Sequence, residues 1–248
     1  MENMLELKNI SHSYHGTEGE TMALSDLSFI LKQGDFVSIV GPSGCGKSTL
    51  LSIISGLIPP EGGEVLLNGS HIGYMLQKDH LLEWRSVYRN ITLGLEVQHK
   101  VDSLTPERVK KLLKQYDLDK FINAKPSELS GGMRQRVALI RTLILEPDLL
   151  LLDEPFSALD YQTRLSVGDD IGQIIRREKR TAILVTHDLA EAISLGDKVV
   201  VLSERPASVK TIVPITFPPD KNTPLLRRDT PEFAEYFNTI WKELNAHD

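Results

Sequence analysis

The stretch that most constrains this chain is residues 41–49, which read GPSGCGKST and match the pattern G-x-x-x-x-G-K-[ST]. The five residues before it, FVSIV, predict a buried strand, and the residues after it give a helix with an apolar face. A strand that leads through a glycine-rich turn into a helix directs several backbone N–H groups and a positive dipole end at one point. A chance match is the alternative, and the strand and helix argue against it.

The sequence therefore predicts a phosphate-binding loop. In such a loop Lys47 reaches the β- and γ-phosphates of a nucleotide, and the Ser48 hydroxyl ligates Mg²⁺. The residues expected to line the loop are Gly41, Pro42, Ser43, Gly44, Cys45, Gly46, Lys47, Ser48 and Thr49.

Composition narrows the class of protein. A chain of 248 residues that is 41% hydrophobic allows one large α/β domain or two small ones. Its longest apolar runs, such as residues 149–152, are far shorter than the roughly 20 residues of a membrane span. The acidic start, MENMLE, does not resemble a signal peptide, so we expect a cytoplasmic protein.

The single cysteine, Cys45, is expected to pack rather than to do redox chemistry. A net charge of −6 argues against broad nucleic-acid binding.

The N-terminal region predicts antiparallel strands. Apolar residues alternate over residues 5–10 and 27–31, and a short strand over residues 65–67 follows a predicted turn at residues 61–64. Tyr14 lies at the end of the antiparallel edge, where its ring could stack on a flat base. A core or surface tyrosine is the ordinary interpretation of such a residue, and only the nearby phosphate loop favours the functional one.

From residue 36 onward strands and helices alternate, which indicates a mostly parallel, doubly wound sheet. Residues 78–136 interrupt this order with helical patterns, one of which begins at Thr105-Pro106. A helical insertion in a sheet-based domain is therefore predicted. At its end Ser130 forms a helix N-cap with two glycines behind it, which would make a second anion-binding helix terminus. A purely structural cap is the commoner interpretation of that pattern alone.

Acidic residues and a histidine follow two predicted strands. The apolar run of residues 149–152 ends in Asp153 and Glu154, at the sheet edge where ligands bind in open parallel sheets. Asp153 can hold Mg²⁺ through water, and Glu154 can act as a base toward an attacking water. His187 follows the strand at residues 181–185 and so lies at the same edge. A solvated turn and a helix-entry histidine are the ordinary alternatives, and the phosphate loop upstream disfavours both.

The C-terminal tail contains an extended, proline-punctuated segment and a final helix that starts at Thr230-Pro231. We expect its apolar stripe to pack on the chain's own core rather than on a partner or lipid. The stripe comprises Phe233, Tyr236, Phe237, Ile240, Trp241 and Leu244.

Together these motifs resemble the ATP-binding subunit of an ABC transporter along nearly the whole chain. Residues 41–49 are similar to Walker A, residues 149–153 to Walker B, and residues 129–135, LSGGMRQ, to the signature motif. Four further positions match in the family's order: Tyr14 the adenine-stacking aromatic, Gln77 the Q-loop glutamine, residues 157–160 the D-loop, and His187 the switch histidine.

The resemblance implies a fold, a set of roles and a domain division. The expected fold is α/β, with a mostly parallel P-loop core sheet, an N-terminal antiparallel β subdomain and an α-helical insertion. Residues 1–77 and 137–205 would form the RecA-like core, residues 78–136 the helical subdomain, and residues 206–248 the tail. Glu154, His187, Lys47 and Gln77 would be catalytic, and Ser48, Gln77 and Asp153 would hold Mg²⁺. The other nucleotide-binding residues would be Ser130, Gly131, Gly132, Gln135 and Asp160.

In this family two subunits face head to tail, so each ATP lies between Walker A of one copy and the signature motif of the other. The resemblance therefore implies a second copy as partner, with Ser130 and Gly132 binding nucleotide in trans. It also implies transmembrane permease subunits, a location on the inner face of the cell membrane and, indirectly, an extracytoplasmic solute-binding protein. No nucleic acid is expected.

One stretch is similar to a particular subfamily. Residues 81–87, LLEWRSV, resemble the LLPWRTV run of bacterial nitrate, sulfonate and taurine importers. Two departures are visible, because the chain is shorter than most members between Val65 and Gln77 and Glu83 stands where proline is usual. They affect which solute is inferred, while the ATPase assignment is unchanged. Gln77 and Trp84 would border the groove for a coupling helix, and no residue of this chain is expected to contact the solute.

The leading hypothesis is thus an ATPase subunit that energises an importer of a small solute. The alternatives are a soluble ABC ATPase acting in DNA repair, ribosome function or cofactor assembly, and the ATPase of an ABC exporter. A P-loop kinase is disfavoured by the signature motif.

Overall fold

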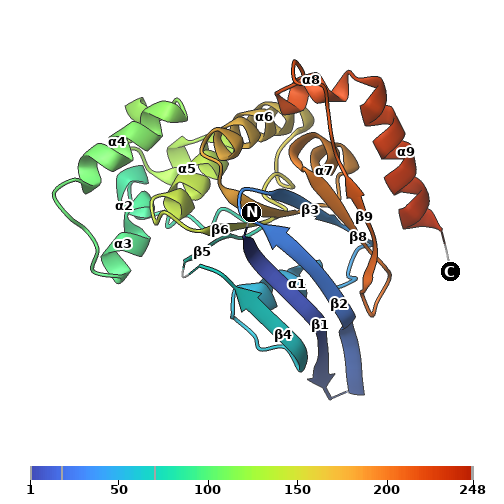
Figure 1. Cartoon of the computed structure of the whole chain (residues 1–248). Helices are drawn as coiled ribbons and strands as arrows, with labels where there is room; N and C mark the ends of the chain where they lie inside the picture. The colour runs from blue at the N-terminus through green and yellow to red at the C-terminus, as the bar shows by residue number, and fades with distance from the viewer. Residues whose placement is uncertain (1, 18, 70, 247–248) are drawn as a thin grey trace.

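The computed structural model describes residues 2–17, 19–69 and 71–246 (Figure 1). A three-stranded antiparallel sheet near the N-terminus has the order β2-β1-β4. Strands β1 (Asn3–Gly16) and β2 (Gly19–Lys32) form a hairpin whose register runs from Asn3 opposite Lys32 to Gly16 opposite Gly19. The hairpin extends well beyond the two short apolar patterns, because polar residues continue the hydrogen-bonded ladder past the core.

Strand β4 (Gly62–Leu67) begins earlier than the sequence predicts, so the predicted turn at residues 61–64 is wrong for all but Glu61. Gly63 has φ +84°, and a Cβ there would lie 2.2 Å from the carbonyl oxygen of Lys8. The pairing of β1 with β4 also shifts register between Lys8 and Ser11. The glycine serves a bulge with close backbone approach rather than a turn.

The central sheet has six strands in the order β5-β6-β7-β3-β8-β9. All neighbours in it are parallel except β8 and β9, which confirms the predicted mostly parallel sheet. Strands β3, β6 and β7 are buried along their whole length, as is usual for a sheet covered on both faces. The strands are β3 (Phe36–Val40), β5 (Ile72–Met75), β6 (Leu149–Asp153), β7 (Thr181–Val185), β8 (Lys198–Leu202) and β9 (Val209–Pro214).

Different layers cover the two faces of this sheet (Figure 1). Leu150 and Leu152 of β6 belong to an apolar cluster with α5 (Gly131–Leu143) and α6 (Tyr161–Arg177). Leu149 and Leu151, which point the other way, belong to a cluster with α1 (Lys47–Ile54) and the three-stranded sheet. A third cluster lies under α7 (Leu189–Leu195) and α9 (Pro231–Asn245).

The helical insertion lies between β5 and β6, at one side of the molecule (Figure 1). It contains α2 (Val87–Ile91), α3 (Leu93–Val97), α4 (Thr105–Gln115) and two 3₁₀ turns, Asp119–Phe121 and Pro126–Glu128. Helix α4 begins at Thr105 with Pro106 in its first turn, as predicted. Helix α5 runs without a break across residue 136, where the sequence division between helical segment and core falls. That division remains a prediction.

The tail ends in α8 (Pro224–Arg228) and α9. Ile240 of α9 is completely buried, whereas the neighbouring Trp241 is 54% exposed. The indole of Trp241 stacks on Phe237, with ring centroids 6.2 Å apart and planes 8° from parallel. The expectation that the apolar stripe packs on the core is therefore confirmed for Ile240 and for the partly buried Phe233, Tyr236, Phe237 and Leu244, and it is wrong for Trp241. None of the helices in the described part of the chain is long and apolar enough to cross a membrane.

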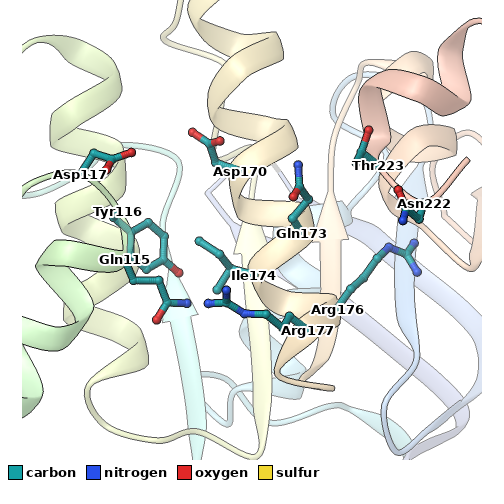
Figure 2. A pocket seen from close by; sticks show the side chains of 10 residues that line it. All are labelled: Gln115, Tyr116, Asp117, Asp170, Gln173, Ile174, Arg176, Arg177, Asn222 and Thr223. Atoms are coloured by element: carbon teal, nitrogen blue, oxygen red, sulfur yellow. The ribbon is translucent and has the colours of Figure 1, made fainter.

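A polar cavity of about 360 Å³ lies between the end of α4, the second half of α6 and the loop before α8 (Figure 2). The hydroxyl of Tyr116 is buried beside it and has no hydrogen-bond partner among the described residues. Burial raises the pKa of this phenol, so it stays protonated. None of the residues that line the cavity is expected to bind nucleotide, so the cavity belongs to the contact of the helical insertion with the core.

Candidate nucleotide-binding and catalytic site

The predicted phosphate-binding loop connects the buried strand β3 to helix α1, which begins at Lys47. Gly44 and Gly46 in the loop have φ +71° and +126°, values that residues with a side chain rarely adopt. A Cβ on Gly46 would also lie 2.9 Å from Leu24 Cδ2 and 3.0 Å from the carbonyl oxygen of Ala23. The loop conformation thus depends on glycine at these positions.

Lys47 holds its ammonium group against the loop. Its Nζ donates hydrogen bonds to the carbonyl oxygens of Gly41, at 2.8 Å, and Pro42, at 2.9 Å. Cys45 is buried beneath, with its Sγ 4.0 Å from Lys47 Nζ. Burial raises the pKa of the Cys45 thiol, which accords with the predicted packing role. Ser43, Gly44 and Ser48 face the solvent.

Ser48 and Asp153 lie together, as the magnesium prediction requires. The Ser48 hydroxyl donates to Asp153 Oδ1 at 3.3 Å, and the Tyr74 hydroxyl donates to Oδ2 at 3.3 Å. Asp153 is buried, and this burial raises the pKa of its carboxyl, while the two hydroxyl donors act in the opposite direction. Burial and the Asp153 charge raise the pKa of Tyr74 to about 12. Sequence reasoning missed Tyr74, because nothing in its short apolar stretch distinguishes it from a core residue.

The donors at this point suit Mg²⁺, which prefers hydroxyl and carboxylate oxygens and usually keeps waters and substrate phosphates as its other ligands. Within residues 2–17, 19–69 and 71–246 no three or more His, Cys, Asp or Glu side chains form a group that could hold a metal by themselves. A site made of one serine, one carboxylate and nucleotide phosphates does not require such a group.

Glu154, Gln77 and His187 meet at the same sheet edge. Glu154 Oε2 accepts a hydrogen bond from Gln77 Nε2 at 3.1 Å and lies 3.1 Å from His187 Nδ1. Gln77 follows β5, Glu154 follows β6 and His187 follows β7. The phosphate-binding loop follows β3, which is the next strand of the sheet. The backbone of Glu154 has φ +44° and donates to the carbonyl oxygen of Val185 at 2.8 Å. The carboxylate is thereby aimed out of the sheet edge, where it can accept a proton.

Tyr14 reaches the phosphate-binding loop from the long hairpin. Its hydroxyl lies 3.1 Å from Thr49 Oγ1, and the ring of His12 packs edge-on at 5.0 Å. About half of the Tyr14 residue is exposed, so one side of its ring is open beside α1. Its predicted stacking on a base remains a prediction.

The signature stretch forms the N-terminus of α5. The Ser130 side chain accepts a hydrogen bond from the backbone N–H of Met133 at 3.4 Å, and Ser130 and Gly131 are exposed. Gly132 is buried against α6, where a Cβ would lie 2.7 Å from Thr163 Cγ2. Gln135 is only 3% exposed, so a contact of its side chain with nucleotide would require it to leave the core. Two of the four predicted residues thus face outward and two pack inward.

Asp160 caps helix α6. Its side-chain oxygens accept hydrogen bonds from the backbone N–H of Thr163 at 3.1 Å and from the Thr163 hydroxyl at 2.6 Å. Hydrogen bonding to Thr163 holds the pKa of Asp160 below its usual range. The structure gives this residue a capping role, and its nucleotide contact stays a prediction.

Ion pairs hold the segment after Gln77 against helix α5. The Arg134 guanidinium pairs with Asp79 Oδ2 at 2.8 Å and with Glu83 Oε1 at 2.7 Å, so the glutamate that replaces the family's usual proline has a counter-ion. Trp84, the next residue, is 75% exposed. Sequence reasoning missed Arg134, since no local pattern predicts an ion pair across about fifty residues.

A glycine-rich loop entering a helix, with a carboxylate pair and a histidine at the same sheet edge, defines a P-loop nucleoside triphosphatase. The family described as ABC transporter matches residues 24–157, and this chain belongs to that family. It is the ATP-binding, ATP-hydrolysing subunit of a transporter.

Two curated relatives show the extent of the similarity. The chain is 43% identical to the uncharacterized ABC transporter ATP-binding protein YtlC of Bacillus subtilis, over 98% of this chain and 96% of the relative. It is 37% identical to the aliphatic sulfonates import ATP-binding protein SsuB of Bacillus cereus, over 88% of this chain and 90% of that protein.

Solved structures agree with the fold. The ATP-binding cassette MJ0796, in a dimeric post-hydrolysis state bound to ADP and Pi, superposes with a TM-score of 0.75 at 30% identity, covering 86% of this chain and all of that one. CbiO1 of Clostridium perfringens, part of the ABC transporter complex CbiONQ, superposes with a TM-score of 0.76 at 26% identity, over 86% and 89% of the two chains. The predicted α/β ABC ATPase fold is confirmed.

Proposed function

We propose that this chain is the energising ATPase of an importer for a small organic solute of the sulfonate, taurine or nitrate type. It works as a head-to-tail dimer with itself, beneath two membrane subunits on the inner face of the cell membrane. Support for import comes from the similarity to the aliphatic sulfonate protein of Bacillus cereus and from residues 81–87. An extracytoplasmic binding protein would deliver the solute.

The observation that carries this proposal is the presence of two helix termini suited to phosphate on different elements. One is the start of α1 at Lys47, beside the Asp153 and Glu154 pair. The other is the start of α5, where Ser130 and Gly131 face outward. A head-to-tail pair of chains brings the second terminus of one copy over the first of the other, so that nucleotide completes both sites. The dimeric state of the ATP-binding cassette MJ0796, bound to ADP and Pi, supports a dimer.

Each side chain has a proposed role. Glu154 accepts the proton of the attacking water, His187 contacts the γ-phosphate, and Lys47 binds the phosphates. Ser48 and Asp153 would hold Mg²⁺, with Gln77 contributing through water, and the ion would neutralise phosphate charge when bound. Because Gln77 and His187 both contact the Glu154 carboxylate, they also orient the base.

Trp84 supports a contact with membrane subunits. A tryptophan that is 75% exposed, next to a segment that is fixed by ion pairs, is more typical of a protein interface than of a free surface. The surface around Gln77 and Trp84 would contact a helix of the membrane subunit.

Copurification from native membranes tests the function. We expect the tagged chain to retain a polytopic membrane protein, and Trp84→Ala to reduce that retention at least about tenfold, as for an interface hot spot. Trp241→Ala, which removes another exposed tryptophan, is the matched control and should retain it. Recovery of ribosomal or repair components without any polytopic protein would contradict the transporter role. Thermal-shift screening of the binding protein encoded nearby, with sulfonates, taurine and nitrate, would identify the solute.

A further inference from the structure

Arg164 joins three segments near the catalytic histidine. Its guanidinium donates from NH2 to the carbonyl oxygen of Leu159 at 3.2 Å. NH1 lies 3.5 Å from Asp188 Oδ2, and Nε lies 3.7 Å from Glu191 Oε1. The cation therefore connects the segment after Glu154 with the helix that follows His187.

Glu191 needs this cation because it is only 4% exposed. A carboxylate so deeply buried is tolerated only where it is paired and hydrogen-bonded. Its Oε2 accepts a hydrogen bond from the Thr186 hydroxyl at 2.7 Å. Burial raises the pKa of Glu191, while the Thr186 hydrogen bond and the Arg164 charge lower it.

The same contacts fix the backbone on both sides of His187. Thr186 Oγ1 accepts a hydrogen bond from the backbone N–H of Asp188 at 3.0 Å. Asp188 Oδ1 caps α7 by accepting from the N–H groups of Ala190, at 2.8 Å, and Glu191, at 3.2 Å. Its other oxygen, Oδ2, is the one that faces Arg164. The residues that flank His187 are thus held by the guanidinium, directly or through Glu191.

At the other end of the network, Leu159 supports the exposed start of α5. A Cβ on Gly131 would lie 3.3 Å from Leu159 Cδ2, so the helix terminus rests on this side chain. Contacts consequently run from Gly131 through Leu159 and Arg164 to the residues beside His187. No role proposed above involves Arg164.

We propose that Arg164 is a positioning residue, which ties the orientation of His187 to Leu159 and thereby to the helix terminus at Gly131. The inference rests on the proposed role of His187 at the γ-phosphate. It provides a route by which a nucleotide held at the start of α5 would affect the hydrolysis site of the same chain. Contiguous contacts alone do not establish coupling, so the test has to measure an interaction energy.

A double-mutant cycle on the full chain provides that test. Arg164→Ala should lower kcat for ATP about tenfold and change KM less than about twofold, because it misplaces a group used only in the reaction. In a His187→Ala background the same substitution should change kcat less than about twofold, since the residue it positions is gone. Arg177→Ala, which removes an exposed arginine from the same helix, is the control and should leave kcat unchanged.

Three outcomes are decisive. A tenfold loss in both backgrounds would overturn the inference and assign Arg164 a structural role independent of His187. Unchanged turnover in Arg164→Ala would overturn it as well. If His187→Ala alone kept full turnover, the proposed function of His187 would fail first, which is distinguishable from failure of the coupling.

Folding is a separate concern, because Arg164→Ala leaves Glu191 buried without its cation. The double variant Arg164→Ala with Glu191→Gln removes both charges and keeps a carbonyl oxygen for the Thr186 hydroxyl. It should show the same tenfold loss with His187 present and none with His187→Ala. A turnover equal to that of the unmodified chain would overturn the proposal.

Discussion

Glu154, the proposed general base, has a carboxylate that two neighbours hold in place. Gln77 and His187 both contact its Oε2 atom, and the backbone bond to Val185 fixes the residue from behind. Its side chain keeps partial access to solvent. An oriented carboxylate of this kind is suited to accept a proton from water.

Glu154→Gln should therefore slow ATP hydrolysis by more than about a hundredfold, the range for loss of a general base. It should leave ATP binding intact, so ATP will hold two copies together. Size-exclusion chromatography with light scattering measures this in saturating ATP. A chain that remains monomeric there would contradict the sandwich dimer.

Asp153 is buried, so its ionised carboxylate lowers the stability of the folded chain. Burial raises the pKa of its carboxyl, so the folded chain binds this proton more tightly than the unfolded chain does. The resulting stability is present below the unfolded pKa of about 4 and is lost as pH rises through the higher folded value.

Asp153→Asn should consequently raise the Tm of the nucleotide-free chain at pH 7 and abolish Mg²⁺-dependent hydrolysis. The gain in Tm should shrink as the pH approaches 4, where the native carboxyl is protonated too. Scanning calorimetry at both pH values measures the effect, with the exposed Asp220→Asn as control. A lower Tm for Asp153→Asn at neutral pH would refute the stability argument.

The proposed role of Tyr14 is to stack on the base through its exposed ring, with no part in the chemical step. Tyr14→Ala should weaken ATP binding by about 1 kcal/mol, as expected for lost stacking, and leave kcat nearly unchanged. Tyr14→Phe, which loses only the contact with Thr49, should bind almost normally. Equilibrium titration with a fluorescent nucleotide distinguishes them, and a large fall in kcat at unchanged affinity would mean that Tyr14 has another role.

At the scale of elements, helix α5 combines an exposed N-terminus with a tightly packed flank. Gly131 is exposed at its start, whereas Gly132 faces α6 so closely that a Cβ would meet Thr163 at 2.7 Å and Val167 at 3.2 Å. Gly131 and Gly132 are adjacent in the sequence, but close packing against α6 restricts only Gly132.

Gly132→Ala should separate α5 from α6 and destabilise the chain by about 1–3 kcal/mol, the usual cost of overpacking. Gly131→Ala meets only the end of the Leu159 side chain at 3.3 Å, so its stability should change by less than about 1 kcal/mol. Its effect should be on ATP-dependent dimerisation instead. Urea unfolding of both variants compares them, and equal destabilisation would show that the two positions are not distinct.

Sequence patterns predict an element best where a short local motif, such as a glycine-rich loop or a helix cap, has a single structural role. The loop of residues 41–49, the cap at Ser130 and the start of α4 at Thr105 were all predicted and are all present. Gly63 was misassigned, because a glycine required by a neighbouring strand looks the same in sequence as a glycine in a turn. Gln135 illustrates a further limit, since only tertiary packing decides which side of α5 is buried.

At the scale of the whole molecule, the tail is part of the core. Ile240 lies in one apolar cluster with α7 and strand β8, while Trp241 lies outside on the same helix. The helical spacing of apolar residues places Ile240 and Trp241 in one stripe. The sequence of this 15-residue helix does not show how wide a strip of it the core covers. The mostly parallel pairing of the central sheet, in contrast, is predicted by the alternation of strands and helices, whereas the order of its strands is not.

Ile240→Ala should cost about 2–5 kcal/mol, as for a buried isoleucine, and lower the single unfolding transition by roughly 4–20 °C for a chain of this size. Trp241→Ala, on the exposed side, should shift Tm by no more than about 2 °C. Differential scanning calorimetry of both variants compares them. A separate low-temperature transition for the tail, or equal shifts in the two variants, would show that α9 is not part of the cooperative core.

The ion pairs of Arg134 have a mechanical consequence. Arg134 and Arg141 lie two turns apart on α5. Arg134 pairs with Asp79 and Glu83, and Arg141 donates a hydrogen bond to the carbonyl oxygen of Asp79, so α5 holds this stretch at two points. A displacement of the neighbouring Trp84 would therefore be passed to α5 through the ion pairs of Arg134. Ser130 caps the same helix one turn from Arg134, so such a displacement would reach the exposed cap over a single helical turn.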